Sequence, residues 1–144
     1  MIQIAGNYQF FHSNIHRAKL LRTVQALFED YKRSLQNLSL VLLNDEEIRE
    51  LNKSSLNHDY YTDILTFDLS ENTFHVETEL YISVDRIREN AKTFKTSNHN
   101  ELLRVILHGC LHIAGHKDKT ETETKQMRAA ENKYIKQYQS LKNG

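Results

Sequence analysis

The sequence predicts a single α+β domain in which a small mixed β-sheet is packed with helices. Strand-like and helix-like segments follow one another in the order β-α-β-α-β-β-α-α-α, which favours this class. The length of 144 residues suffices for one hydrophobic core. Hydrophobic residues make up 39% of the chain and charged residues 26%, as in folded globular proteins. We therefore expect residues 1–144 to form one domain.

The first half of the chain contains two predicted strands and two predicted helices. A short strand is expected near Ile2–Ala5, and the compact, mostly branched run SLVLLN at Ser39–Asn44 is typical of a buried strand. Ser13 is a suitable N-cap for the first helix. The apolar residues of that helix recur at steps of three and four: Leu20, Leu21, Val24, Leu27, Phe28 and Tyr31. Asn44 and Glu47 have the spacing of a capping box, which predicts a short second helix.

Two further strands and a helix are expected in the middle of the chain. Side chains alternate in DILTFDL at Asp63–Leu69 as they do in a strand, and another short strand is expected at Glu79–Ser83. Ser83 can cap the helix that follows, which has an apolar inner side. With the two earlier strands, these segments supply the small mixed sheet.

Two helices are predicted in the last third of the chain. Asn98 and Glu101 have capping spacing, and they introduce the segment ELLRVILHGCLHIAG. This segment is apolar around most of its circumference, which predicts a central buried helix. Thr120 and Glu123 can cap the last helix. That helix has one apolar stripe: Met127, Ala130, Tyr134, Tyr138 and Leu141.

Composition and charge exclude several classes of protein. The single cysteine cannot form an internal disulfide, which favours a reducing, cytoplasmic location. The sequence has no run of about 18 apolar residues, and its start lacks the pattern of a signal peptide, so we expect no membrane partner. The chain has 19 basic and 19 acidic residues, so it does not coat nucleic acid through its overall charge. An RNA partner would need a local basic patch.

Two histidines on the predicted central helix have the spacing of a metal site. His108 and His112 are four residues apart, and side chains at this spacing stack on one helix face with Cβ atoms about 5–6 Å apart. Such pairs also occur by chance as ordinary core or surface histidines. The apolar surroundings favour the metal interpretation, because an unpaired imidazole is costly to bury.

A third ligand must come from beyond Gly115, where we expect the helix to end. His116 continues the four-residue spacing, but on a continuous helix it would lie about 12 Å from His108, too far to share an ion. If the chain turns at Gly115, Asp118 is better placed to reach back over His112. We therefore predict a metal site of His108, His112 and Asp118 at the end of the central helix, with a fourth position left for water.

The number and type of these ligands indicate the chemistry of the site. Three protein ligands and an open position are typical of a catalytic ion. Two imidazoles and one carboxylate favour Zn²⁺, although nickel or another transition metal would bind the same set. Zinc peptidases of the HExxH type carry their general base directly after the first histidine. That position is Gly109 here, so the peptidase base is missing.

The residues around this cluster resemble a signature of the YbeY family of single-strand-specific endoribonucleases, also called rRNA maturation factors. The family signature is H-G-x-L-H-L-x-G-Y-D-H, and residues 108–118 read HGCLHIAGHKD. Two histidines, two glycines and a leucine match. Residues 51–69, LNKSSLNHDYYTDILTFDL, are similar to the family's second signature, an LN…TDVLSF segment. The two signatures occur in the family's order, so the resemblance extends over nearly the whole chain.

The resemblance implies a metal-dependent endoribonuclease that acts on single-stranded RNA. It implies a role in maturation of the 3′ end of 16S rRNA and in ribosome quality control, with rRNA and ribosomal particles as partners. On this interpretation one ion, held by His108, His112 and Asp118, activates water and stabilises the charged transition state. Attack by water and attack by the RNA 2′-hydroxyl both stay open from the sequence.

The chain departs from the family pattern at several positions. Asp118 replaces the family's third metal-binding histidine and remains a chemically sound ligand. His116 replaces a tyrosine and is a candidate for a contact to a ligand or to the substrate. Leu56 stands where the family carries an arginine, so any charge that this arginine supplies must come from elsewhere.

Four basic residues are candidates for that charge and for substrate binding. Lys53 and His58 belong to the second signature, and Lys117 precedes the predicted ligand Asp118. Arg104 lies one helical turn before the first ligand, where it could reach the mouth of the site or pair with Glu101.

Two other functions stay open from the residues alone. One is a metallohydrolase of another substrate class, such as a peptidase or amidase, and Gly109 counts against it. The other is a non-catalytic, ribosome-associated RNA-binding module in which a structural metal holds the helix end in place.

Overall fold

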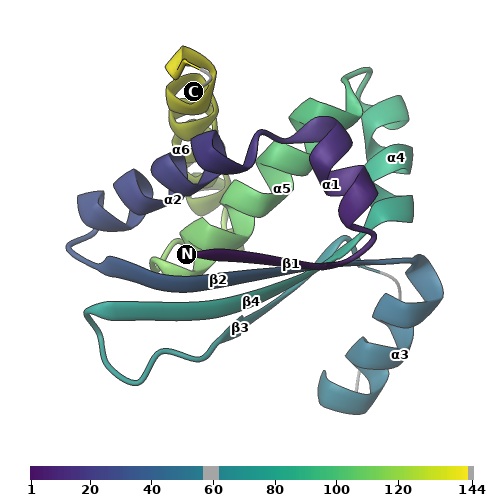
Figure 1. Ribbon diagram of the computed structural model, residues 1–144, viewed down its shortest axis with the longest axis horizontal. Helices are drawn as coiled ribbons and strands as arrows, with labels where there is room; N and C mark the ends of the chain where they lie inside the picture. Colours follow the sequence, from purple (N-terminus) through teal and green to yellow (C-terminus); the bar gives the residue numbers. More distant parts are fainter. Residues whose placement is uncertain (57–61, 143–144) are drawn as a thin grey trace.

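A computed structural model describes residues 1–56 and 62–142, in which a layer of helices covers one face of a four-stranded sheet (Figure 1). The strands are β1 (Ile2–Gly6), β2 (Ser34–Leu43), β3 (Ile64–Asp68) and β4 (His75–Ser83). The helices are α1 (Tyr8–Asn14), α2 (Arg17–Asp30), α3 (Asp45–Leu56), α4 (Val84–Thr93), α5 (Asn98–Ile113) and α6 (Glu121–Ser140). Figure 1 shows α3 below the sheet and the other labelled helices above it. Among the described residues, no helix is long and apolar enough to cross a membrane.

The sheet is mixed, as the sequence predicts. The strand order is β1-β2-β4-β3, and β3 is the edge strand that runs antiparallel to its neighbour. β1, β2 and β4 are parallel, and Leu40 of β2 stands in register between Ile4 and Leu80. Leu40 and Leu80 are fully buried beneath the helix layer, so the core lies between that layer and the upper face of the sheet.

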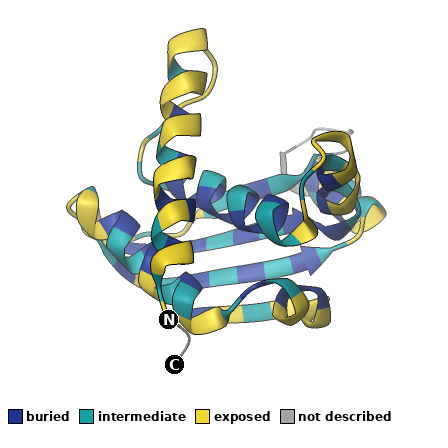
Figure 2. Ribbon diagram, turned by 90° about the horizontal axis from the view of Figure 1, so that it is seen from above, coloured by how far each residue is buried: buried dark blue, intermediate teal, exposed yellow. Residues whose placement is uncertain are grey.

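α5 is the central helix of the layer and lies very close to the sheet at Gly109. Figure 2 shows that α5 is mostly buried and that strands alternate between buried and less buried residues, whereas the outer side of α6 is exposed. A Cβ atom at Gly109 would lie 2.8 Å from Ile64 Cδ1 and 3.1 Å from Leu80 Cδ1, closer than carbon atoms normally pack. A side chain at this position would push the ends of Ile64 and Leu80 aside, so the absence of a Cβ atom allows α5 to lie this close to the sheet.

The structure adds a short helix, α1, that was not predicted from the sequence, and it moves the start of the predicted first helix, α2, to Arg17. The side chain of Asn7 caps α1 by accepting a hydrogen bond from the backbone N–H of Phe10. Ile15 is extended and ends that helix, and His16, rather than Ser13, caps α2. Asn7 and His16 each satisfy a free N–H at a helix start, which stabilises α1 and α2 as separate helices.

β2 and β4 both begin earlier than the sequence predicts. β2 begins at Ser34 rather than Ser39, and β4 begins at His75 rather than Glu79. A β-bulge after Leu35 allows Leu35 and Leu38, which are three residues apart, to be buried together. The regular alternation that identifies a strand is therefore interrupted here.

The helix caps agree closely with the sequence. Asn44 Oδ1 accepts a hydrogen bond from Glu47 N at 2.8 Å, and Glu47 Oε1 accepts one from Asn44 N at 3.1 Å. Thr120 and Glu123 form the same capping box at the start of α6. The cap of α5 is Ser97, one residue earlier than predicted, so the predicted caps of α2 and α5 are the two that differ.

Gly109→Glu should lower the free energy of unfolding by about 3 kcal/mol or more, because the new side chain would bury a charge and displace Ile64 and Leu80. Urea unfolding followed by circular dichroism measures this change. Ala129→Glu, at an exposed position of α6, is the control and should change stability by less than about 0.5 kcal/mol. Equal stability of the two variants would contradict the tight contact between α5 and the sheet.

Candidate metal centre

The candidate site lies at the C-terminal end of α5, where the chain reverses direction. Gly115 has a φ of +112°, a conformation that is costly for residues with a Cβ atom. Its N–H donates to the carbonyl of His112 at 3.0 Å, and the N–H of His116 donates to the carbonyl of Leu111 at 2.9 Å. These two hydrogen bonds form a Schellman motif. The reversal directs the next residues back along the last turn of α5.

The reversal brings together the three side chains that the sequence predicts as ligands. The Nε2 atoms of His108 and His112 are 3.0 Å apart. Asp118 Oδ2 lies 3.4 Å from His108 Nε2 and 3.3 Å from His112 Nε2. In the described part of the chain, no other three histidine, cysteine or acidic side chains meet closely enough to hold an ion.

These separations fit a tetrahedral metal ion. Ligand atoms at the usual 2.0–2.1 Å from Zn²⁺ lie about 3.3 Å from one another in a tetrahedron. His108, His112 and Asp118 therefore fit three of its corners. Their side chains are 26%, 31% and 39% exposed, so the fourth corner is accessible from solvent. The arrangement could hold a metal and leave one position for water or a substrate oxygen.

Both imidazole rings are oriented by hydrogen bonds on the side away from this trio. His108 Nδ1 lies 2.7 Å from Glu131 Oε2, and His112 Nδ1 lies 3.0 Å from the carbonyl oxygen of His116. The carbonyl can only accept and the Glu131 carboxylate is charged, so these contacts favour the tautomer in which each Nδ1 carries the proton and donates it. The Nε2 atoms are then unprotonated and face Asp118, which is the tautomer that binds a metal.

Glu131 connects α6 to the site and is itself almost completely buried, with 3% exposure. Its Oε1 accepts a hydrogen bond from Arg104 at 2.8 Å and lies 3.5 Å from a guanidinium nitrogen of Arg128. Burial acts to raise the pKa of Glu131, but hydrogen bonds from His108 and Arg104 outweigh burial and lower it. Glu131 therefore stays charged and compensated inside the protein.

The electrostatics of the site favour a bound cation. Burial acts to lower the pKa of His108, but the Glu131 carboxylate, together with Asp118 and Asp63, raises it above its ordinary value. A negative potential that favours a proton on this imidazole also favours a metal ion in the proton's place.

Sequence reasoning missed Glu131, and it left the role of Arg104 undecided between the site mouth and Glu101. A signal for Glu131 was present, because it lies on α6 between the buried residues Met127 and Tyr134. A charged side chain on a core-facing stripe needs a buried partner. The partner, which lies on another helix, could not be identified from spacing along α6.

His116 contributes to the site through its backbone rather than through its ring. Its carbonyl accepts the hydrogen bond from His112. Its imidazole Nε2 is hydrogen-bonded to the hydroxyl of Tyr31, and the two rings meet edge to face with centroids 5.3 Å apart. The ring therefore ties the loop to the end of α2.

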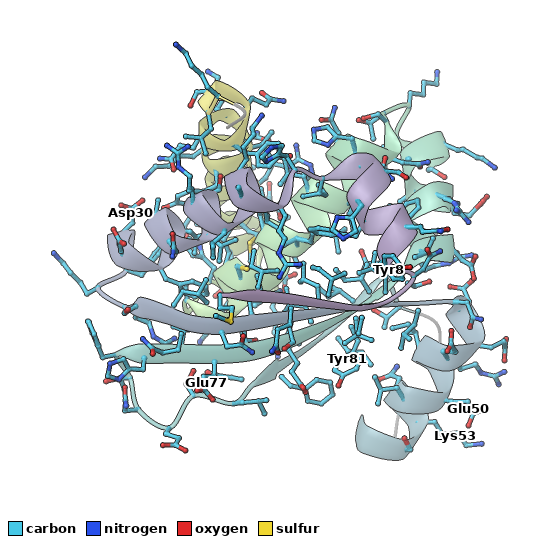
Figure 3. The ribbon with its side chains drawn as sticks, in the orientation of Figure 1. Tyr8, Asp30, Glu50, Lys53, Glu77 and Tyr81 are labelled. Carbon is cyan, nitrogen blue, oxygen red and sulfur yellow. The ribbon has the colours of Figure 1, made fainter. Side chains whose placement is uncertain are left out.

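The other candidates for substrate binding do not all lie near the three predicted ligands. Lys117 is exposed beside Asp118 on the loop that follows α5. Lys53 is exposed on α3, on the opposite side of the sheet from α5, and its side chain points outward (Figure 3). His58 and the side chain of Leu56 lie outside the described residues.

Known proteins match this chain over most of its length. A family model described as Endoribonuclease YbeY matches residues 7–139. The Endoribonuclease YbeY of Cytophaga hutchinsonii is 40% identical over 115 residues, which is 80% of either chain. That of Parabacteroides distasonis is 42% identical over 112 residues, or 78% of either chain. The solution structure of TM1509 from Thermotoga maritima matches with a TM-score of 0.65 and 28% identity, and covers 96% of this chain and 89% of its own.

Asp118→Ala should weaken Zn²⁺ binding by more than about 100-fold. Loss of a residue that only supports a ligand typically weakens metal binding 10–100-fold, and loss of a ligand itself should weaken it further. Competition with a chromophoric chelator measures the affinity. Asp118→His should restore most of it, because imidazole is also a zinc ligand. Unchanged affinity in Asp118→Ala would exclude this carboxylate from the site.

Glu131→Gln should weaken Zn²⁺ binding by about 10–100-fold, because an amide accepts the His108 proton less strongly than a carboxylate. The same competition titration measures the change, with circular dichroism as the check on folding. Glu121→Gln, on a side chain that is 87% exposed on α6, is the matched control and should bind as the unaltered protein does. Equal affinity in both variants would show that Glu131 does not orient the ligand.

Proposed function

This chain belongs to the YbeY endoribonuclease family, and we propose on that premise that it is a metal-dependent endoribonuclease that cuts single-stranded RNA. The family match supports the type of reaction. The observation that carries the metal requirement is the approach of the three donor atoms of His108, His112 and Asp118 to within 3.0–3.4 Å of one another.

The chain's own residues would prepare the site for hydrolysis. His108, His112 and Asp118 would hold one ion and leave a position open to water. When bound, such an ion lowers the pKa of water and stabilises negative charge on a phosphate. Glu131 and the carbonyl of His116 would keep the two imidazoles in the metal-binding tautomer, so little reorganisation is needed when the ion arrives.

Binding of RNA phosphates requires positive side chains near the trio. Because Leu56 replaces the arginine of the family pattern, this charge must come from other residues. Lys117 neighbours Asp118 and is exposed. The side chain of Arg128 is 60% exposed, and its contact to Glu131 is the longer of the two arginine contacts there. We propose that Lys117 and Arg128 bind phosphates that flank the cut bond. His58 stays a further candidate from the sequence.

We propose Zn²⁺ as the native ion, because two imidazoles and one carboxylate suit it, although nickel or another transition metal would also fit. The proposed substrate in the cell is rRNA, in particular the 3′ end of 16S rRNA. Ribosomal particles, ribosome quality control and a cytoplasmic location follow from the same resemblance, carried by residues 51–69 and 108–118.

The rival functions are disfavoured by two features of the site. The position of the glutamate that a HExxH peptidase uses is Gly109, where a side chain would collide with Ile64 and Leu80. Structural zinc sites are usually closed by four protein ligands, whereas this cluster offers three.

Cleavage of a labelled single-stranded oligoribonucleotide tests the proposal. We expect the zinc-loaded protein to cut it, the chelator-treated protein to lose activity, and added Zn²⁺ to restore it. Asp118→Ala should be at least about 100-fold slower, in line with losses of catalytic electrostatic groups. Oligodeoxyribonucleotide and duplex RNA are the controls and should stay intact. Equal, trace cleavage by loaded and metal-free protein would contradict a metal-dependent nuclease.

A further inference from the structure

A cavity of about 570 Å³ lies beside His108, between α4, α5 and α6. This volume is within the usual range for a small-molecule site. His108 lines one part of the cavity, and Asn100 lines another. Since these residues are eight positions apart on α5, the cavity extends about 12 Å along the helix. It therefore begins at the proposed metal ligands and runs away from them.

The lining suits a planar group that forms hydrogen bonds. Phe94 lines the cavity and is 65% exposed, so one side of its ring is available for stacking. Asn90, Asn100 and Gln139 contribute amide groups, each of which both donates and accepts hydrogen bonds. An exposed aromatic ring combined with amides is the chemistry that binds an unpaired nucleobase.

The charges in the cavity favour a neutral base over a phosphate. Arg104 lines it with its guanidinium group bound to Glu131 and Asn132, and Arg128, the exposed arginine proposed above for a flanking phosphate, lies 3.5 Å from Glu131. Asp63 and Glu101 add two more carboxyl groups, so the lining has no excess of positive charge.

The two additional carboxyl groups also indicate which bases fit. Glu101 is only 6% exposed, and burial raises the pKa of both Glu101 and Asp63. Asn90 already forms a side-chain hydrogen bond to Glu101, and a further donor would relieve more of this desolvation. Adenine, cytosine and guanine carry an exocyclic amino group whose two N–H bonds can donate to both carboxylates, whereas uracil offers a single N3–H between two carbonyl oxygens that a carboxylate would repel.

We propose that this cavity binds the base next to the phosphodiester that is cut, and that it selects amino-bearing bases over uracil. The inference rests on the proposed nuclease function, because the ion-binding trio at the His108 end would place the phosphate there. Phe94 would then stack on the base, and Glu101 and Asp63 would accept hydrogen bonds from its amino group.

Binding of AMP, CMP, GMP and UMP to the zinc-loaded protein, followed by NMR titration, tests the base site without any cleavage. UMP should bind at least about fivefold more weakly than the other three. Phe94→Ala should weaken binding of every nucleotide about tenfold. Phe74→Ala, which removes a ring that is 53% exposed outside the cavity lining, is the control and should change nothing. Glu101→Gln should reduce the discrimination against UMP.

Parallel cleavage of oligoribonucleotides that differ at one position separates this inference from the nuclease proposal. We expect faster cutting next to adenine, cytosine or guanine than next to uracil, and loss of this preference in Glu101→Gln. Cleavage that is equal for all bases, with equal binding of the four nucleotides, overturns the base site alone. Absence of any RNA cleavage by the zinc-loaded protein overturns the nuclease proposal and this inference with it.

Discussion

The candidate metal centre depends on the reversal of the chain at Gly115. Two histidines on one helix face supply only two ligands, and the helix itself cannot bring a third residue to them. The left-handed conformation of Gly115, closed by two backbone hydrogen bonds, turns the next segment back until Asp118 reaches both imidazoles. A side chain at this φ would strain the turn, so the third ligand depends on glycine.

A second constraint is the close packing of helices around buried charge. Gly109 allows α5 to lie close to the sheet, and this packing positions His108, the preceding residue on the helix. Glu131 reaches the same imidazole from α6 and stays charged because Arg104 neutralises it. Such a buried network tolerates no missing partner, since an uncompensated charge is costly in the interior. The ligand geometry is therefore determined by tertiary packing as much as by the motif.

Much of this architecture could be predicted from local patterns, and the differences have physical causes. The capping box of Asn44 and Glu47 and the convergence of His108, His112 and Asp118 follow from rules that operate within a few residues. The unpredicted helix α1, which buries Phe10 and Phe11, and the bulge after Leu35 depend on which side chains pack into the core. Glu131 and the cavity beside α5 require three helices to meet, and no spacing within one segment encodes that meeting.

The most direct test is X-ray absorption spectroscopy at the zinc edge on the protein loaded with one equivalent of Zn²⁺. We expect four light-atom ligands, two of them imidazoles, at about 2.0–2.1 Å. In Asp118→Ala the spectrum should lose the carboxylate and gain a water-derived oxygen. A spectrum with six loosely held oxygen ligands and no imidazole, or one that Asp118→Ala leaves unchanged, would contradict a site formed by the reversal at Gly115.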